Sequence, residues 1–179
     1  DVSATLRDSL FGRVPAVVLT SATLTTDGKF DFVRARLGLQ EEIDELVLES
    51  PFDYPRQSCL YIPPGMPEPR DPDFAEVAAR QVRDLVAVTG GGAFVLCTSL
   101  RMMNALHRLC APHLSGRILR QGDAPKASLL ERFRADGDAV LFASASFWEG
   151  VDVPGDALRL VIIDKLPFAS PGDPITAAR

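Results

Sequence analysis

From Ala93 onward, short apolar runs alternate with longer amphipathic stretches, and this alternation is the feature that most restricts the fold. The runs 93–97 and 139–143 are flanked by small or hydroxyl residues, as is typical of strands buried on both faces. Two further short strands are predicted over 117–119 and 160–163. Strands that alternate with helices form right-handed βαβ units. The sequence therefore predicts an α/β fold with a mainly parallel sheet.

Three helices are predicted between and before these strands. The first follows Asp71-Pro-Asp73 and ends at the glycines 90–92, the second is capped by Ser99, and the third begins near Asp123 and Pro125. Apolar residues at helical spacing define their inward faces: Phe74, Val77, Ala78, Val82, Leu85 and Val86; Leu100, Met103, Leu106, His107 and Cys110; Leu129, Leu130 and Phe133. The glycines 90–92 close a helix and precede a strand, which is the reverse of a phosphate-binding glycine loop, so we predict that they are turn residues.

The first third of the chain has a different pattern. A strand is predicted over 16–19 and another over 59–62, whereas the acidic stretch 40–49 is predicted to be a linker or a short helix. Five prolines within 63–72 exclude a helix there. We place a domain junction near Ser50.

Composition sets limits on the class of protein. A chain of 179 residues fits one domain, or one domain and a fragment of another, and 46% hydrophobic with 24% charged residues is ordinary for a globular protein. No apolar run approaches the roughly 20 residues that span a bilayer, and there is no charged and apolar leader, so we expect no membrane partner and a cytoplasmic location. The net charge of −5 argues against nucleic-acid binding by bulk electrostatics, although backbone N–H groups and hydroxyls can hold a few phosphates.

No metal site is predicted from the cysteine and histidine residues. Cys59, Cys97 and Cys110 form no Cys-x-x-Cys pair, and all three lie in apolar surroundings where a free cysteine behaves as a small hydrophobe. His107 and His113 lack a third ligand at metal spacing. Burial of the thiols is therefore the expectation.

The segment Ser144-Ala-Ser-Phe-Trp-Glu-Gly-Val-Asp-Val-Pro-Gly155 concentrates the residues that suggest chemistry. It follows a predicted strand, and ligands of open α/β sheets bind at the carboxyl ends of the strands. Phe147 and Trp148 are adjacent large aromatics, of which we expect one to pack into the domain and one to face a ligand. The sequence favours a nucleic-acid and nucleotide contact loop; the alternative is a surface turn.

With these segments in order, the chain resembles the superfamily 2 helicases of the DinG and XPD type. Residues 19–24 (Leu-Thr-Ser-Ala-Thr-Leu) resemble the third motif of that family, and 50–54 resemble the segment that leads into its second motor domain. Residues 94–99 resemble the fourth motif, Gln121-Gly122 its companion, and 144–155 the fifth. The resemblance runs along nearly the whole chain.

The resemblance implies a RecA-like three-layer fold and a division of the chain. Residues 1–50 would hold the end of the first motor domain and a linker, and 51–179 the second RecA-like domain, cut before the sixth motif. The implied parent protein is an ATP-dependent DNA helicase that couples ATP hydrolysis to translocation on single-stranded DNA and duplex unwinding. Its cofactors would be ATP and Mg²⁺, and its partners single-stranded DNA and the first RecA-like domain. Relatives often carry an iron–sulfur cluster, but this chain contains none of its ligands.

The resemblance also implies roles for particular residues. Those expected to couple the nucleotide and DNA sites are Ser21 and Thr23; those expected to contact the strand are Thr98, Ser99, Gln121, Ser144 and Phe147 or Trp148; those expected to sense the nucleotide are Glu149, Gly150 and Asp152. Simpler interpretations stay open for several of them. Ser21 and Thr23 can merely end a strand, and Ser99 can merely cap a helix.

The chain lacks the groups that cleave ATP in such motors. Its lysines are Lys29, Lys126 and Lys165, and none lies in Gly-x-x-x-x-Gly-Lys-Ser/Thr, nor is there an Asp-Glu-x-His box. We therefore predict that the isolated chain is inactive. The alternative function is a catalytically inactive helicase-like module that binds DNA or protein.

Overall fold

The computed structural model describes residues 2–39 and 43–168, and the chain divides into two compact units, Asp1–Leu60 and Tyr61–Arg179. The boundary falls ten residues after Ser50, where the sequence suggested the junction. Each unit has its own local structure and is described by itself.

The second unit is built on a four-stranded sheet in which every pairing is parallel. The strands are β1 (Ala93–Leu96), β2 (Ile118–Arg120), β3 (Val140–Ala143) and β4 (Leu160–Ile163), in the order β2-β3-β1-β4. Ala93 lies opposite Val140 on one side and opposite Leu160 on the other. The predicted α/β class and parallel sheet are confirmed, and each predicted strand from 93 onward forms within one or two residues of its expected bounds.

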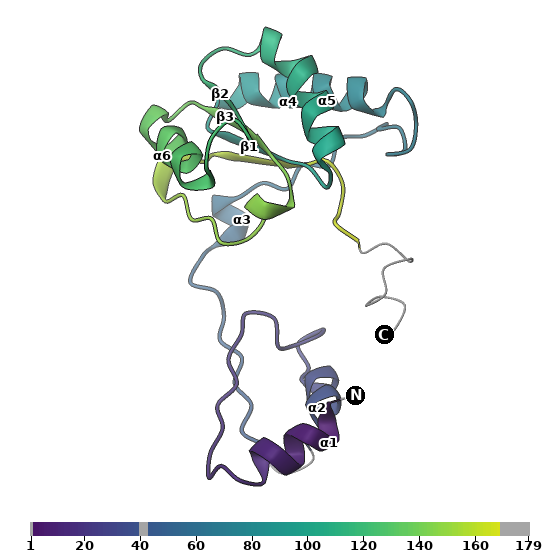
Figure 1. The fold of residues 1–179 in the computed structure, drawn as a ribbon, viewed down its shortest axis with the longest axis vertical. Helices are drawn as coiled ribbons and strands as arrows, with labels where there is room; N and C mark the ends of the chain where they lie inside the picture. Colours follow the sequence, from purple (N-terminus) through teal and green to yellow (C-terminus); the bar gives the residue numbers. More distant parts are fainter. Residues whose placement is uncertain (1, 40–42, 169–179) are drawn as a thin grey trace. The chain divides into compact units, whose positions relative to one another are not determined.

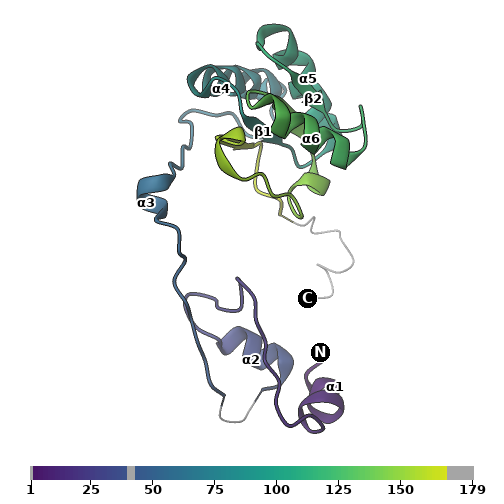
Figure 2. The ribbon, with the colours of Figure 1, turned by 90° about the vertical axis from the view of Figure 1, so that its left-hand side faces the viewer.

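Helices cover both faces of this sheet, giving three layers. α4 (Phe74–Thr89) and α5 (Leu100–Cys110) lie side by side in both views, and α6 (Lys126–Asp136) lies on the opposite side of the sheet (Figures 1 and 2). Three short 3₁₀ turns are also present. η2 (Ala111–His113) follows α5, η3 (Ala145–Phe147) follows β3, and η4 (Gly155–Ala157) lies in the loop before β4. The layers bury two clusters of apolar side chains.

Alternation along the strands divides the core between the two faces. On the face of α4 and α5, Val95 and Phe142 pack with Val82, Met103 and Leu106 of the helices. On the face of α6, the intervening strand residues Phe94 and Leu141 pack with Leu129 and Phe133; the rings of Phe94 and Phe133 are 4.6 Å apart. Successive strand residues point to opposite faces, so both faces of each strand are apolar, as the unbroken apolar runs predicted.

The glycines at 90–92 form the turn between α4 and β1, as predicted. Gly90 caps α4 in the left-handed conformation. Gly91, with φ of +96°, passes so close to Asp138 that a Cβ atom would lie 2.1 Å from the Asp138 carbonyl oxygen. The expected loop with five prolines also forms: 63–72 contains no helix or strand.

β4 is an edge strand of the sheet. Within the described residues it pairs only with β1, and its side chains alternate between half-buried and exposed. Val161 and Ile163 are 49% and 45% exposed, respectively. Among the described residues the outer backbone groups of β4 are therefore unpaired, and the exposed Val161 and Ile163 lie on one face of this edge strand.

The first unit contains short elements: α1 (Ser3–Leu6), the π-helical turn η1 (Arg7–Phe11), α2 (Asp31–Leu37) and α3 (Tyr54–Gln57). The prediction of a strand over 16–19 is wrong, since this segment has no regular secondary structure and pairs with no described strand, and Val18 is 85% exposed. An apolar β-branched run forms a strand only beside a partner. In the acidic stretch, 43–49 has no helix, and 40–42 lie outside the described residues.

The strand predicted over 59–62 is likewise absent from the described structure. Leu60 and Ile62 are 88% and 77% exposed, and Cys59 is exposed, which corrects the expectation that its thiol is buried. The physical reason is the same, because no strand of the described structure pairs with this run and its side chains are left exposed.

Candidate functional site

The residues that follow the four strands gather at one edge of the sheet. Because all strands are parallel, their carboxyl ends lie together, and they lead into Thr98 after β1, Gln121 after β2, Ser144 after β3 and Asp164 after β4. The helix after β1 packs on one face and the helix after β2 on the other, which is the arrangement that opens a crevice for ligands in α/β sheets. Three of these four residues were predicted site residues.

Gln121 and Ser144 contact each other directly. Oε1 of Gln121 accepts the backbone N–H of Ser144 at 2.7 Å and its hydroxyl at 3.0 Å. A backbone N–H can only donate, so the amide oxygen must face Ser144 and Nε2 must point elsewhere. Among the described residues Nε2 has no hydrogen-bond partner, and Gln121 is half-buried. The contact thus holds two unused donors at the strand ends.

Thr98 is held by Asp164, a residue that the sequence analysis missed. The Asp164 carboxylate accepts the Thr98 backbone N–H at 2.9 Å and the Thr98 hydroxyl at 3.2 Å, and it also accepts the backbone N–H of Lys165 at 2.9 Å. Burial raises the pKa of Asp164, and these three donors partly offset that shift. Both donors of Thr98 are engaged. A polar residue at the carboxyl end of a predicted strand was the available signal for Asp164.

Ser99 caps α5 as predicted. Its hydroxyl oxygen accepts the backbone N–H of Met102 at 3.2 Å, and Ser99 is exposed. Because the oxygen acts as acceptor in the cap, the hydroxyl proton remains available to a ligand. Capping and ligand contact are therefore compatible at this residue.

Of the two adjacent aromatic residues in the loop after β3, Phe147 packs into the domain. Phe147 is 3% exposed and packs in the cluster under α6, so it presents no free face. Trp148 is half-buried beside the same cluster. Its indole Nε1 is buried and has no hydrogen-bond partner among the described residues. The expectation that one ring packs into the domain thus applies to Phe147.

Glu149, Gly150 and Asp152 lie on the exposed part of this loop. Gly150 has φ of +63°, a left-handed conformation that a residue without Cβ adopts readily. Neither carboxylate makes a hydrogen bond or ion pair within the described structure. The segment therefore presents two carboxylates that are open to the surroundings.

Ser21 and Thr23 lie in the first unit. The Thr23 backbone N–H donates to the Ser21 hydroxyl at 3.2 Å, and the two hydroxyl oxygens are 3.3 Å apart. Both residues are exposed. This is a local hydroxyl turn, which fits the simpler interpretation and leaves the coupling role as a proposal.

Buried thiols and the central histidine have structural surroundings. Burial raises the pKa of Cys97 to about 12 and that of Cys110 to about 11, so both stay protonated. The ring of His107 meets Phe142 edge-on at 5.4 Å, and burial lowers its pKa. Within 2–39 and 43–168, no three His, Cys, Asp or Glu side chains come together as a metal site, and no helix is long and apolar enough to cross a bilayer.

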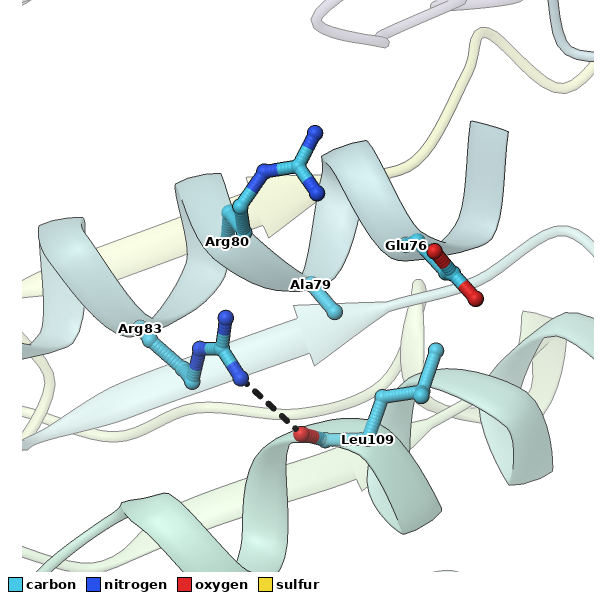
Figure 3. Close-up of a pocket in the computed structure, with 5 residues that line it drawn as sticks. All are labelled: Glu76, Ala79, Arg80, Arg83 and Leu109. Carbon is cyan, nitrogen blue, oxygen red and sulfur yellow. Dashed lines mark hydrogen bonds between the residues drawn. The ribbon is translucent and has the colours of Figure 1, made fainter. Parts of the chain in front are cut away.

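Two hollows lie on the surface of the second unit. One, of about 460 Å³, borders Gln121 at the strand ends and is lined by Leu100, Met103, Asn104, Arg120, Gln121, Gly122 and Asp123. The other, of about 160 Å³, lies between α4 and α5 (Figure 3). There Arg83 donates to the Leu109 carbonyl at 3.4 Å, a favourable place for a cation near the end of α5. Only the first borders residues expected to bind a ligand.

The three layers, the parallel sheet and the hydroxyl and amide groups at its carboxyl edge define a RecA-like α/β domain of the helicase type. Residues 82–179 match the family described as Helicase C-terminal domain, and the chain belongs to that family. This confirms the family expected from the sequence.

Individual relatives point to the same family. The chain is 43% identical over 162 residues to the ATP-dependent DNA helicase YoaA of Escherichia coli, covering 90% of this chain and 25% of the relative. It is 37% identical over 181 residues to the ATP-dependent helicase DinG of Mycobacterium tuberculosis, covering 99% and 27%. A 3′-5′ exonuclease DinG of Bacillus subtilis is 37% identical over 183 residues, covering 97% and 20%. The chain thus spans about a quarter of the length of the first two relatives and a fifth of the third.

Proposed function

We propose that this chain is part of an ATP-dependent DNA helicase, in which ATP hydrolysis drives translocation on single-stranded DNA and duplex unwinding. In this proposal residues 51–179 are the second RecA-like motor domain and residues 1–50 the end of the first with a linker. The names of the relatives support the activity. The structural observation that carries the proposal is the orientation of Gln121, whose amide donors lie free at the shared end of the strands.

The contacts to the DNA strand follow from which donors are free. Gln121 Nε2 and the Ser99 hydroxyl are proposed to donate to phosphate oxygens, since sequence-independent contacts to single strands are made to the backbone. Thr98 and Ser144 use their own donors within the domain, so their proposed role is to hold this edge in place. Trp148 is the proposed stacking residue, because Phe147 is buried and offers no ring face to a base.

The nucleotide would be held mainly by other parts of the parent protein. Glu149, Gly150 and Asp152 are proposed to face it, because the loop exposes both carboxylates and an open glycine backbone. Ser21 and Thr23 are proposed to couple the nucleotide and DNA sites. ATP and Mg²⁺ are the proposed cofactors of the parent, and phosphate transfer chemistry is supplied by groups outside this sequence, which contains neither a P-loop nor an Asp-Glu-x-His box.

The test is DNA-stimulated ATP hydrolysis by the full-length parent, with Gln121→Glu as the decisive variant. Glutamate keeps an oxygen for Ser144 but replaces the free amide donors by a negative charge facing the phosphates. We expect the single-stranded DNA concentration for half-maximal stimulation to rise by about tenfold or more, the effect of a lost and now repulsive phosphate contact. Gln81→Glu on α4, the same change of charge away from the strand ends, is the matched control.

Two results would contradict the proposal. The first is DNA stimulation that Gln121→Glu and Gln81→Glu leave equally unaffected. The second is ATP turnover by the isolated 179-residue chain, because it would remove the argument for a divided site. DNA binding by the parent without any ATP turnover would instead support the inactive binding module.

A further inference from the structure

Lys126, the first residue of α6, makes three contacts to the loop after β3. Its ammonium group donates to the Ser146 carbonyl at 2.6 Å and to the Glu149 carbonyl at 3.2 Å. It also lies 5.2 Å from the centroid of the Phe147 ring. Hydrogen bonds from a charged donor are stronger than neutral ones, and the aromatic face adds a cation–π attraction. One side chain therefore fixes both ends of the segment 146–149.

Arg134 holds the next part of the same loop. It lies eight residues further along α6, about two helical turns, and its guanidinium donates to the Asp152 carbonyl. Between the two cations, the buried ring of Phe147 packs in the same cluster as Leu130 and Phe133 of α6. The loop is thus attached to the helix by a cation at each end and an apolar contact between them.

We infer that Lys126 and Arg134 are positioning residues that set the conformation of the nucleotide-facing segment 149–152. Both cations bind peptide carbonyls, and neither forms an ion pair with the neighbouring acidic side chains in the described structure. The Glu149 and Asp152 carboxylates are therefore not engaged by these cations and stay open to a group outside this domain. This inference rests on the proposed role of the segment, and it assigns α6 as the element to which that segment is fastened.

The loop after β3 is also attached to Gln121, the proposed DNA contact. Lys126 stands five residues after Gln121, where the connection from β2 ends and α6 begins. Gln121 bonds Ser144 at one end of the loop, and Lys126 bonds Ser146 and Glu149 further along. The proposed DNA contact at Gln121 and the segment 149–152 are therefore joined through this connection and through the loop.

Hydrogen–deuterium exchange in the full-length parent tests the attachment. The variants are Lys126→Met and Arg134→Met, with Lys126→Arg and Arg134→Lys as conservative rescues. Arg132→Met is the matched control, because Arg132 lies on α6, is exposed and makes no hydrogen bond or ion pair to the loop in the described structure. We expect about tenfold faster exchange of the peptide covering 144–152 in each methionine variant, as for the loss of charge-assisted hydrogen bonds, and wild-type exchange in the control.

A second measurement relates the attachment to function. With single-stranded DNA present, kcat for ATP should fall in Lys126→Met and recover in Lys126→Arg. The peptide 93–97 reports on folding: if Lys126→Met accelerates exchange there too, Arg134→Met decides the question. Wild-type exchange over 144–152 in both methionine variants would overturn the inference. Hydrogen–deuterium exchange is measured without ATP turnover. A parent that lacks ATPase activity would therefore contradict the proposed function, while the exchange rates would still test the attachment of the loop to α6.

Discussion

Ser144 donates its backbone N–H and its hydroxyl to one oxygen of Gln121, which joins the ends of β3 and β2. Ser144 is only 8% exposed, so loss of the acceptor leaves two buried donors unsatisfied. The residues are 23 apart in the chain, and the contact exists because parallel strands bring them to one edge. Stability and ligand contact are therefore linked at this pair.

Gln121→Leu should destabilise the 179-residue chain by about 1–3 kcal/mol, because it removes the acceptor that both Ser144 donors have among the described residues. Ser144→Ala should cost less, about 0.5–1.5 kcal/mol, since the backbone N–H keeps its partner. Urea unfolding followed by the fluorescence of the single tryptophan measures both. The exposed Gln57→Leu serves as control, and equal losses in Gln121→Leu and Gln57→Leu would contradict the contact.

Asp164→Asn should change how stability depends on pH. The pKa of Asp164 is raised above 3.8 in the folded chain, mainly by burial. Its contribution to stability is therefore fully present below pH 3.8 and is lost as the pH rises through the raised pKa. Relative to the asparagine variant, the wild type should lose stability over this range. Urea unfolding at several pH values measures the difference, and a wild type that gains stability on the variant as pH rises would refute the prediction.

Trp148→Phe should leave the fold as stable as the wild type or slightly more stable. The indole Nε1 is buried without a partner, and removing such a group relieves a penalty of about 1–3 kcal/mol, which offsets the lost contact area. Trp148→Ala should instead weaken the DNA stimulation of ATP hydrolysis in the parent, by the roughly 1–3 kcal/mol of one stacked base. Thermal unfolding followed by circular dichroism and ATPase titrations with DNA measure the two effects. A large loss of stability in Trp148→Phe would contradict this prediction.

Gly91→Ala should be far more damaging than Gly65→Ala. Both glycines have positive φ, which costs a residue with Cβ about 1–2 kcal/mol. At Gly65 no atom lies within 4 Å of the added Cβ, whereas at Gly91 the Asp138 carbonyl oxygen lies at 2.1 Å, so backbone must move. Comparison of the two variants by urea unfolding isolates the effect of the close approach. Similar losses would indicate that conformation alone sets the requirement for glycine.

The strands and helices of the second unit could be predicted because their signals are local. An apolar run such as 93–97 has to be buried on both faces, and Ser99 caps the helix it precedes wherever that helix packs. The strands predicted over 16–19 and 59–62 did not form, because the same local signal says nothing about whether a partner strand is present. Local pattern thus predicts what a segment is able to form, and pairing decides whether it does.

The candidate site was predicted only in part for a related reason. Gln121 and Ser144 were identified as strand-end residues, but their mutual hydrogen bond depends on the order of β2 and β3 in the sheet. Asp164 lies 66 residues from Thr98, so no local spacing connects them. Likewise, which of Phe147 and Trp148 is buried depends on how α6 covers the loop. The sequence shows only that the two aromatic residues are adjacent.

The outer edge of β4 has a consequence for the self-association of this chain in solution. Within 2–39 and 43–168 the outer peptide groups of β4 have no strand partner, and such a row, here flanked by Val161 and Ile163, is a template onto which another copy of the same strand can add. In concentrated samples, self-association should begin there. A lysine at 161 or 163 would introduce charge repulsion between copies while leaving the inward-facing side chains of the strand untouched.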